Sequence, residues 1–213
     1  MKLKKDERIL FIGDSITDAG RNRADSFDLG NGYPFLVAET LKKLHPELGL
    51  TFYNRGISGN KINYLEGRWM EDCIALKPTV VSILIGINDT WHSLFSPSFA
   101  SEEALAEFEA SYRNILVRTK EETDAKIVMM EPFVLSYPED RLSWREDLDP
   151  RIQVIRRLAN EFADEYIPLD GYLNATGMKL GYQALTGDDG VHPTPTGHQH
   201  IADAWLQVLS PML

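Results

Sequence analysis

The sequence predicts an α/β protein, with a parallel sheet covered by helices on both faces in a three-layer α/β/α sandwich. Two observations lead to this prediction. Short apolar runs recur along the chain without alternating polar residues, which is typical of strands buried on both faces. Segments with the periodicity of amphipathic helices separate these runs, and such alternation favours right-handed crossovers between parallel strands.

Four apolar runs are expected to form the strands. Each is short and consists mostly of β-branched or large apolar residues. Residues 31–44 and 61–77 separate the first three runs and are each expected to form a helix. Pro132–Arg145 is the longest irregular segment and is expected to be a surface loop. The expected strands are, in order, Ile9–Gly13, Thr51–Asn54, Val80–Gly86 and Lys126–Met130.

Three later helices have clearer sequence signals. Asp149 followed by Pro150 has the pattern of an N-cap acceptor and a first-turn proline, so a helix is expected to begin there and run to residue 162. Thr194 followed by Pro195 predicts the last helix in the same way. An earlier helix, within residues 102–120, is predicted by one apolar stripe, formed by Leu105, Phe108, Tyr112, Ile115 and Leu116.

The composition indicates a single acidic globular domain, residues 1–213. The formal net charge is −10, whereas nucleic acids and anionic membranes bind basic faces, so neither is expected as a partner. The single cysteine, Cys73, excludes a disulfide framework and a multi-cysteine zinc site. The apolar run after the charged first residues is too short for a signal-peptide core, so a cytoplasmic location is expected.

Small, hydroxyl, amide and acidic residues follow three of the expected strands. The segments are Gly13–Asp18, Arg55–Asn60 and Gly86–His92, and a fourth, Asp188–Pro193, precedes the last helix. Ligands of such folds bind in the crevice at the carboxyl ends of the strands. These four segments therefore predict a reactive site.

Ser15 is the candidate nucleophile of this site. A serine hydroxyl is a weak nucleophile, so it needs an adjacent base that a third group holds in place. The backbone N–H groups of Ser15 and Gly59, with the side-chain amide of Asn88, can act as donors to an oxyanion. This set of groups indicates acyl transfer.

Two pairs of residues have the D-x-x-H spacing that can supply the base and its partner. Asp189 and His192 form one pair, and Asp89 and His92 form the other. The histidine would take the proton and the carboxylate would fix its tautomer. Spacing and periodicity do not choose between the pairs.

The four segments together resemble the SGNH hydrolases, also called GDSL-type esterases and lipases. That family is recognised by four sequence blocks in order. Gly13-Asp14-Ser15 matches the first, with Ile16 where the motif has leucine, and the others are matched by Gly56–Gly59, Gly86–Asp89 and Asp189–Pro193. The resemblance covers about residues 8 to 205.

The resemblance implies a flavodoxin-like fold and assigns the roles at the site. Ser15 would be the nucleophile, and Asp189 and His192 the acid and base. Ser15, Gly59 and Asn88 would form the oxyanion hole. Neither a metal nor another cofactor is expected.

Longer stretches are similar to intracellular bacterial acetylxylan esterases of this class, which implies deacetylation of xylo-oligosaccharides or related carbohydrates. These stretches include Phe11–Arg21, Gly56–Asn60 and Ile83–Trp91, whereas Thr186–Asp189 and most of residues 132–150 do not contribute to this closer match. The expected substrate contacts are Asp14, Arg68, Trp69, Trp91 and His92.

Several of these expectations have alternatives. Asp14 can instead pin the turn of the nucleophile, and Trp69 and Trp91 can each pack in the core or stack on a sugar. A lysophospholipase or short-chain lipid esterase of the same fold is a second function. A metal-dependent phosphohydrolase is a third, with the ion held by Asp14, Asp18, Asp89 and His92. A non-catalytic flavodoxin-like binding module is a fourth, and assembly into a homo-oligomer stays open.

Overall fold

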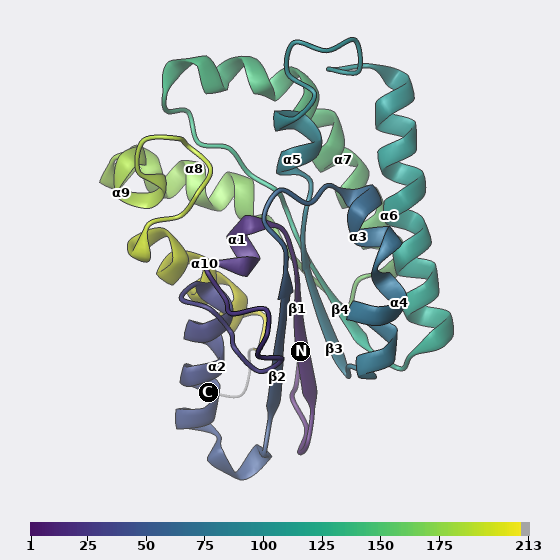
Figure 1. Cartoon of the computed structure of the whole chain (residues 1–213). Coiled ribbons are helices and arrows are strands. Elements are labelled where there is room, and N and C mark those ends of the chain that lie inside the picture. The colour runs from purple at the N-terminus through teal and green to yellow at the C-terminus, as the bar shows by residue number, and fades with distance from the viewer. Residues whose placement is uncertain (210–213) are drawn as a thin grey trace.

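The computed structural model describes residues 1–209, which form one parallel sheet between two layers of helices (Figure 1). The strand order is β2-β1-β3-β4-β5, and every neighbouring pair is parallel. This arrangement confirms the three-layer flavodoxin-like fold. The strands are β1 (Arg8–Gly13), β2 (Thr51–Gly56), β3 (Val80–Leu84), β4 (Lys126–Met130) and β5 (Glu165–Ile167).

Ten α-helices lie within the described residues, together with 3-10 turns at Pro46–Leu48, Ile74–Leu76 and Glu139–Trp144. The helices are α1 (Ser15–Asp18), α2 (Tyr33–Leu44), α3 (Ile62–Gly67), α4 (Trp69–Asp72), α5 (Ile87–Trp91), α6 (Glu102–Glu122), α7 (Arg145–Phe162), α8 (Leu169–Leu180), α9 (Tyr182–Thr186) and α10 (Pro195–Gln207).

The side chains of the central strands alternate between two hydrophobic cores. In β1, Ile9 and Phe11 point to the core beneath α2, α8 and α10, whereas Leu10 and Ile12 point to the core beneath α3, α4 and α6. All four side chains are fully buried. This double burial explains why the strands read as continuous apolar runs, and it holds the strand ends rigidly in place.

Two expected helices differ in the structure. Residues 61–77 form two short helices and a 3-10 turn, because the backbone leaves helical geometry at Arg68 (φ −109°, ψ 10°) and again at Cys73. Asp149-Pro150 does not begin a helix, because α7 starts at Arg145 and contains Pro150. Side-chain bonds hold the turn before the proline: Arg145 bonds Asp170, and Asp147 accepts from Thr90 and Arg151.

The segment Pro132–Arg145 is not a surface loop throughout. Phe133, Val134 and Leu135 are fully buried and belong to the core beneath α2, α8 and α10. Only the following 3-10 turn lies at the surface, and it carries the exposed Leu142. The segment therefore packs on the protein body and brings residues 139–144 to the edge of the sheet.

The carboxyl ends of the strands form the upper edge of the sheet in Figure 1, where α1 and α5 begin. The chain runs from β1 outward to β2 and then returns to β3 on the other side of β1, so the topology reverses between β1 and β3. Crevices at such reversals are the usual ligand sites of open α/β sheets. No helix within residues 1–209 is both long and apolar enough to cross a bilayer.

Candidate active site

Ser15, His192 and Asp189 form a continuous chain of hydrogen bonds at this edge. Ser15 is the first residue of α1, directly after β1, and His192 lies in the loop before α10. The Ser15 Oγ lies 2.9 Å from His192 Nε2, and His192 Nδ1 lies 2.6 Å from Asp189 Oδ2. In this geometry the imidazole can accept the serine proton at Nε2 while the carboxylate holds its other nitrogen.

The loop that carries His192 is fixed by its own backbone. Asp189 Oδ1 accepts hydrogen bonds from the N–H groups of Val191 and His192, each at 2.8 Å. Gly190 has φ +75°, and a Cβ there would lie 2.1 Å from the carbonyl oxygen of Tyr137, so only glycine fits. Arg141 also donates from Nε to the Asp189 carbonyl oxygen at 2.8 Å. The histidine is therefore presented by a rigid turn.

The carboxylate of Asp189 makes His192 a stronger base. The hydrogen bond to Asp189 raises the pKa of His192 above 6.5. Burial acts to raise the pKa of Asp189, but the bonds from the His192 ring and from two backbone N–H groups outweigh it, so that pKa lies below its usual value. Asp189 therefore stays ionised while His192 gains basicity.

Asp14 pins the nucleophile turn and does not contact substrate. Its side chain caps α1 by accepting from the Ile16 N–H at 3.0 Å, and the residue is 1% exposed. The prediction of Asp14 as a substrate contact is therefore wrong, whereas its alternative role is what the geometry shows. Burial raises the pKa of Asp14 to about 7.

Gly59 lies in the loop after β2, and Asn88 lies in α5, which follows β3. Gly59 has φ +80°, which favours glycine. The buried Asn88 donates one N–H of Nδ2 to the Asn60 carbonyl oxygen at 3.1 Å, which orients its amide. The N–H of Ser15 is at the start of a helix, where such groups have no intrahelical acceptor. The three groups have the donor chemistry of an oxyanion hole.

Arg68 fastens the segments around this hole to one another. Its guanidinium donates to the Asn60 side chain, to the carbonyl oxygens of Gly13 and Arg55, and to the Asp72 carboxylate. These four bonds give Arg68 a structural role, and its contact with substrate stays a prediction. Arg68 positions Asn60, and Asn60 in turn orients Asn88.

The two predicted tryptophans lie in different surroundings. Trp69 has no exposed surface and donates from Nε1 to the Thr119 hydroxyl in the core, so its prediction as a substrate contact is wrong. Trp91 is half-buried, and its ring centroid lies 5.7 Å from that of His192. Trp91 is therefore the tryptophan that borders the hydrogen-bonded triad.

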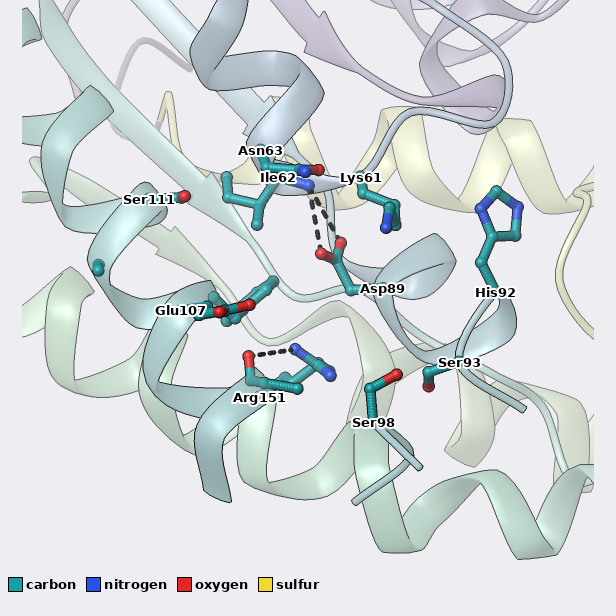
Figure 2. Close-up of a pocket in the computed structure, with 13 residues that line it drawn as sticks. Lys61, Ile62, Asn63, Asp89, His92, Ser93, Ser98, Glu107, Ser111 and Arg151 are labelled. Carbon is teal, nitrogen blue, oxygen red and sulfur yellow. Dashed lines mark hydrogen bonds between the residues drawn. The ribbon is translucent and has the colours of Figure 1, made fainter. Parts of the chain in front are cut away.

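The second D-x-x-H pair is arranged differently. The carboxylate of Asp89 accepts from the N–H of Ile62 at 3.2 Å and is directed toward α3, whereas His92 is exposed and points away from it (Figure 2). Burial raises the pKa of Asp89 to about 7. Both residues line a cleft of about 440 Å³ with polar walls, among them Lys61, Glu107 and Arg151.

The ion site of the phosphohydrolase alternative is not formed. Asp18 accepts from Arg23 and from Ser58, and Asp89 accepts from Ile62, so their carboxylates serve different segments. Among residues 1–209, no three His, Cys, Asp or Glu side chains are grouped so that they could hold a metal ion.

Sequence reasoning did not foresee the contacts of two residues near the site. Arg141 lies in the segment without a recognisable motif, and its bond to the Asp189 loop depends on how residues 132–144 pack. Asn60 was visible as the residue after Gly59, but its link between Arg68 and Asn88 is tertiary. No local sequence pattern predicts either contact.

The fold and the site define an ester hydrolase of the SGNH type: a doubly wound sheet with serine, glycine, asparagine and histidine at the strand ends. Comparison with known proteins gives the family. The model of the GDSL-like lipase/acylhydrolase family matches residues 11–200, so the chain belongs to this family.

Several relatives are similar over nearly their whole length. An acetylxylan esterase from Geobacillus stearothermophilus is 39% identical over 212 residues, which cover 97% of this chain and 95% of the relative. The crystal structure of Axe2, an acetylxylan esterase from the same organism, superimposes with a TM-score of 0.86 at 38% identity and covers 99% of this chain and 97% of that one. A mutant described as an acetyl-xylooligosaccharide esterase gives a TM-score of 0.87 at 37% identity, with the same coverage. The chain is a carboxylic ester hydrolase.

Proposed function

We propose that this chain is a serine acetylesterase that removes acetyl groups from short xylose oligosaccharides or related carbohydrates. The observation that carries the proposal is the Ser15–His192–Asp189 chain, with distances of 2.9 and 2.6 Å between its hydrogen-bonding atoms. The similarity to acetylxylan esterases supports the acetyl group and the sugar. The cytoplasmic location expected from the sequence stays part of this proposal.

The first half of the reaction acylates the serine. His192 Nε2 takes the hydroxyl proton as Ser15 Oγ attacks the acetyl carbonyl carbon. The negative charge that forms on the carbonyl oxygen is met by the N–H groups of Ser15 and Gly59 and by the Asn88 amide. When the tetrahedral intermediate collapses, the bond to the sugar oxygen breaks and that oxygen receives the proton from His192.

The second half releases acetate. Water takes the place of the sugar alcohol, loses a proton to His192 Nε2 and attacks the acetyl carbon. The bond to Ser15 Oγ then breaks, and His192 returns the proton to the serine. Asp189 keeps the imidazole in one tautomer and stabilises its cationic form throughout.

Replacing the proposed nucleophile tests this function. Ser15→Ala should lower kcat for p-nitrophenyl acetate by about 10⁴-fold or more, and His192→Ala should be similar because residues that act as a unit fail together. His92→Ala, from the other D-x-x-H pair, should be much milder. The melting temperatures of all three variants check that they are folded. Retention of a tenth of the activity by Ser15→Ala would refute the assignment, and the reverse order of the histidines would move the base to His92.

A further inference from the structure

A cleft lined by aromatic side chains lies beside His192. It has a volume of about 750 Å³ and is bordered by the loop after α5 and by the 3-10 turn before α7. Its apolar walls come from Trp91, Phe95, Phe99 and Trp144, and its polar walls from Asp140, Arg141 and the serines 96 and 143. We call it the aromatic cleft, to distinguish it from the polar cleft of Figure 2.

Two contacts join the aromatic cleft to the proposed catalytic groups. The Trp91 ring packs against the His192 ring, with centroids 5.7 Å apart, and against Trp144 at 5.1 Å. Arg141 lies with its guanidinium carbon 4.4 Å from the Trp144 ring centroid, and its Nε bonds the Asp189 carbonyl oxygen. The cleft therefore opens on the side of the site where the base stands.

The reaction requires the alcohol on that side. His192 Nε2 must hand its proton to the oxygen that leaves, so the leaving oxygen has to lie within hydrogen-bond reach of the histidine. The carbonyl oxygen lies instead toward Gly59 and Asn88. The polar cleft lies close to these two donors: its residue Asp89 directly follows Asn88, and a Cβ on Gly59 would be 4.0 Å from Cε1 of His92, which also lines that cleft.

The walls of the aromatic cleft suit a sugar. Pyranose rings present C–H faces that pack on aromatic rings, and their hydroxyl groups hydrogen-bond to carboxylates, guanidinium groups and hydroxyls. Phe95 is fully exposed and Trp91 half-exposed, so flat apolar surface is accessible next to the polar groups. An alkyl chain would instead lie against the Arg141–Asp140 ion pair and the Ser143 hydroxyl, and it would displace the water around these groups without replacing its hydrogen bonds.

From the direction of proton transfer and this lining, we propose that the aromatic cleft binds the sugar of the leaving alcohol, with Trp91 as the platform next to the scissile ester. This inference rests on the proposed function, since it takes His192 as the proton donor. It places specificity in residues 91–99 and 140–144, outside the four sequence blocks.

Substrate selectivity of Trp91 variants tests the cleft. The measured quantity is the ratio of kcat/KM for an acetylated xylo-oligosaccharide to kcat/KM for ethyl acetate, whose alcohol has no ring. Trp91→Leu keeps an apolar contact but loses the flat face, so the ratio should fall by about tenfold. Trp91→Phe should restore most of it. Glu107→Gln and Ser111→Ala, which alter the polar cleft instead, should leave the ratio at the wild-type value.

Binding of xylobiose to Ser15→Ala separates this inference from the proposed function, because it needs no turnover. Adding Trp91→Leu should weaken binding by about tenfold.

The outcomes separate the two proposals. If Ser15→Ala is inactive but neither the kcat/KM ratio nor xylobiose binding changes in the Trp91 variants, the cleft assignment fails and the proposed esterase function is retained. If the kcat/KM ratio changed only in Glu107→Gln or Ser111→Ala, the sugar would be assigned to the polar cleft. If long-chain esters were hydrolysed faster than acetate, and Trp91→Leu removed that advantage, the cleft would bind the acyl chain instead of the sugar. If Ser15→Ala stays active, the proposed mechanism fails, whatever the result of the xylobiose-binding experiment.

Discussion

The side-chain amide of Asn88 has two roles: one N–H holds the side chain in place, and the other is proposed to bind the oxyanion. Its amide nitrogen has two N–H groups, of which one bonds the Asn60 carbonyl oxygen. The other can be directed at an oxyanion without further reorganisation, since the residue is buried and already oriented. A donor held in this way acts mainly when charge develops in the transition state.

Asn88→Ala should therefore lower kcat for acetyl esters by about 10²–10³-fold with little change in KM. Steady-state kinetics on p-nitrophenyl acetate measure both constants, and circular dichroism confirms that the variant is folded. An unchanged kcat with a raised KM would mean that the amide binds the ground state and not the oxyanion.

The pH dependence of activity follows from His192. The imidazole must be neutral to accept the proton, and its pKa is raised above 6.5 by the hydrogen bond to Asp189. Activity should consequently be low at acid pH, rise as the pH passes through this raised pKa, and level off above it. His198 does not add a step near neutrality, because burial and then the charge of His192 lower its pKa to about 4.

Asp189→Asn tests the cause of this profile. Without the carboxylate the imidazole loses the interaction that raises its pKa, so the rise in kcat/KM should move to lower pH. The plateau should also fall, by about 10⁴-fold, because the tautomer is no longer fixed. A profile with the wild-type inflection would show that another group sets the pH dependence.

At the scale of elements, the oxyanion segments are held as a unit by α1 and by the turn between α3 and α4. Ser58 donates to Asp18 at the end of α1 from both its N–H and its hydroxyl, at 3.1 and 3.2 Å. Arg68 bonds Asn60 and Gly13 from the other side. The geometry of the proposed oxyanion hole therefore depends on hydrogen bonds made by side chains outside the hole.

Arg68→Met should lower kcat by up to about 10²-fold while KM changes little, because a displacement of about 1 Å at reacting groups has effects of this size. Arg113→Met is the matched control, since Arg113 makes its ion pairs on the exposed face of α6. If Arg68→Met raised KM and left kcat intact, Arg68 would bind substrate directly, as the sequence predicts.

The sequence predicted the elements that are buried on both faces and missed those defined by tertiary contacts. The runs in β1, β3 and β4 are almost wholly buried, so composition alone identified them. β5 has three residues, two of them half-exposed, and lacks that signal. The cap signals located α10 correctly but misplaced α7, where side-chain bonds to Asp147 and Arg145 outweigh the local preference at Asp149-Pro150.

The same division applies to the site. Motif and fold were enough to predict Ser15, Gly59, Asn88, Asp189 and His192, because these residues follow strands or precede a helix. The structure joins three of them, Ser15, His192 and Asp189, by hydrogen bonds. Trp69, the first residue of α4, was misassigned because sequence does not tell whether a large side chain of a short helix faces the crevice or the core. That distinction is made only by packing.

At the scale of the whole molecule, the net charge of −10 opposes adsorption to anionic lipid surfaces. The two clefts described next to the site have charged and hydroxyl groups in their walls. A long alkyl chain would therefore meet polar groups in either one. This favours short acyl groups over the lipid-ester alternative.

The series of p-nitrophenyl acetate, butyrate and octanoate should accordingly give falling values of kcat/KM. An apolar acyl channel would do the opposite, since each buried CH₂ contributes about 0.8 kcal/mol. Measuring initial rates below the micelle concentration of each ester avoids surface effects. A rise of even tenfold along the series would overturn the carbohydrate assignment and favour a lipid ester.

The proposed nucleophile, Ser15, and the proposed base, His192, are 177 positions apart in the chain, although Ser15 Oγ and His192 Nε2 are 2.9 Å apart in space. During synthesis on a ribosome, the segment with Ser15 emerges long before the loop with His192. A nascent chain therefore carries an inert serine for most of its translation, and no ester can be cleaved until the last helix has docked beside α2. If the chain were cleaved in an exposed loop between Ser15 and His192, each fragment alone should lack esterase activity. Reassociation of the two fragments should restore the release of acetate.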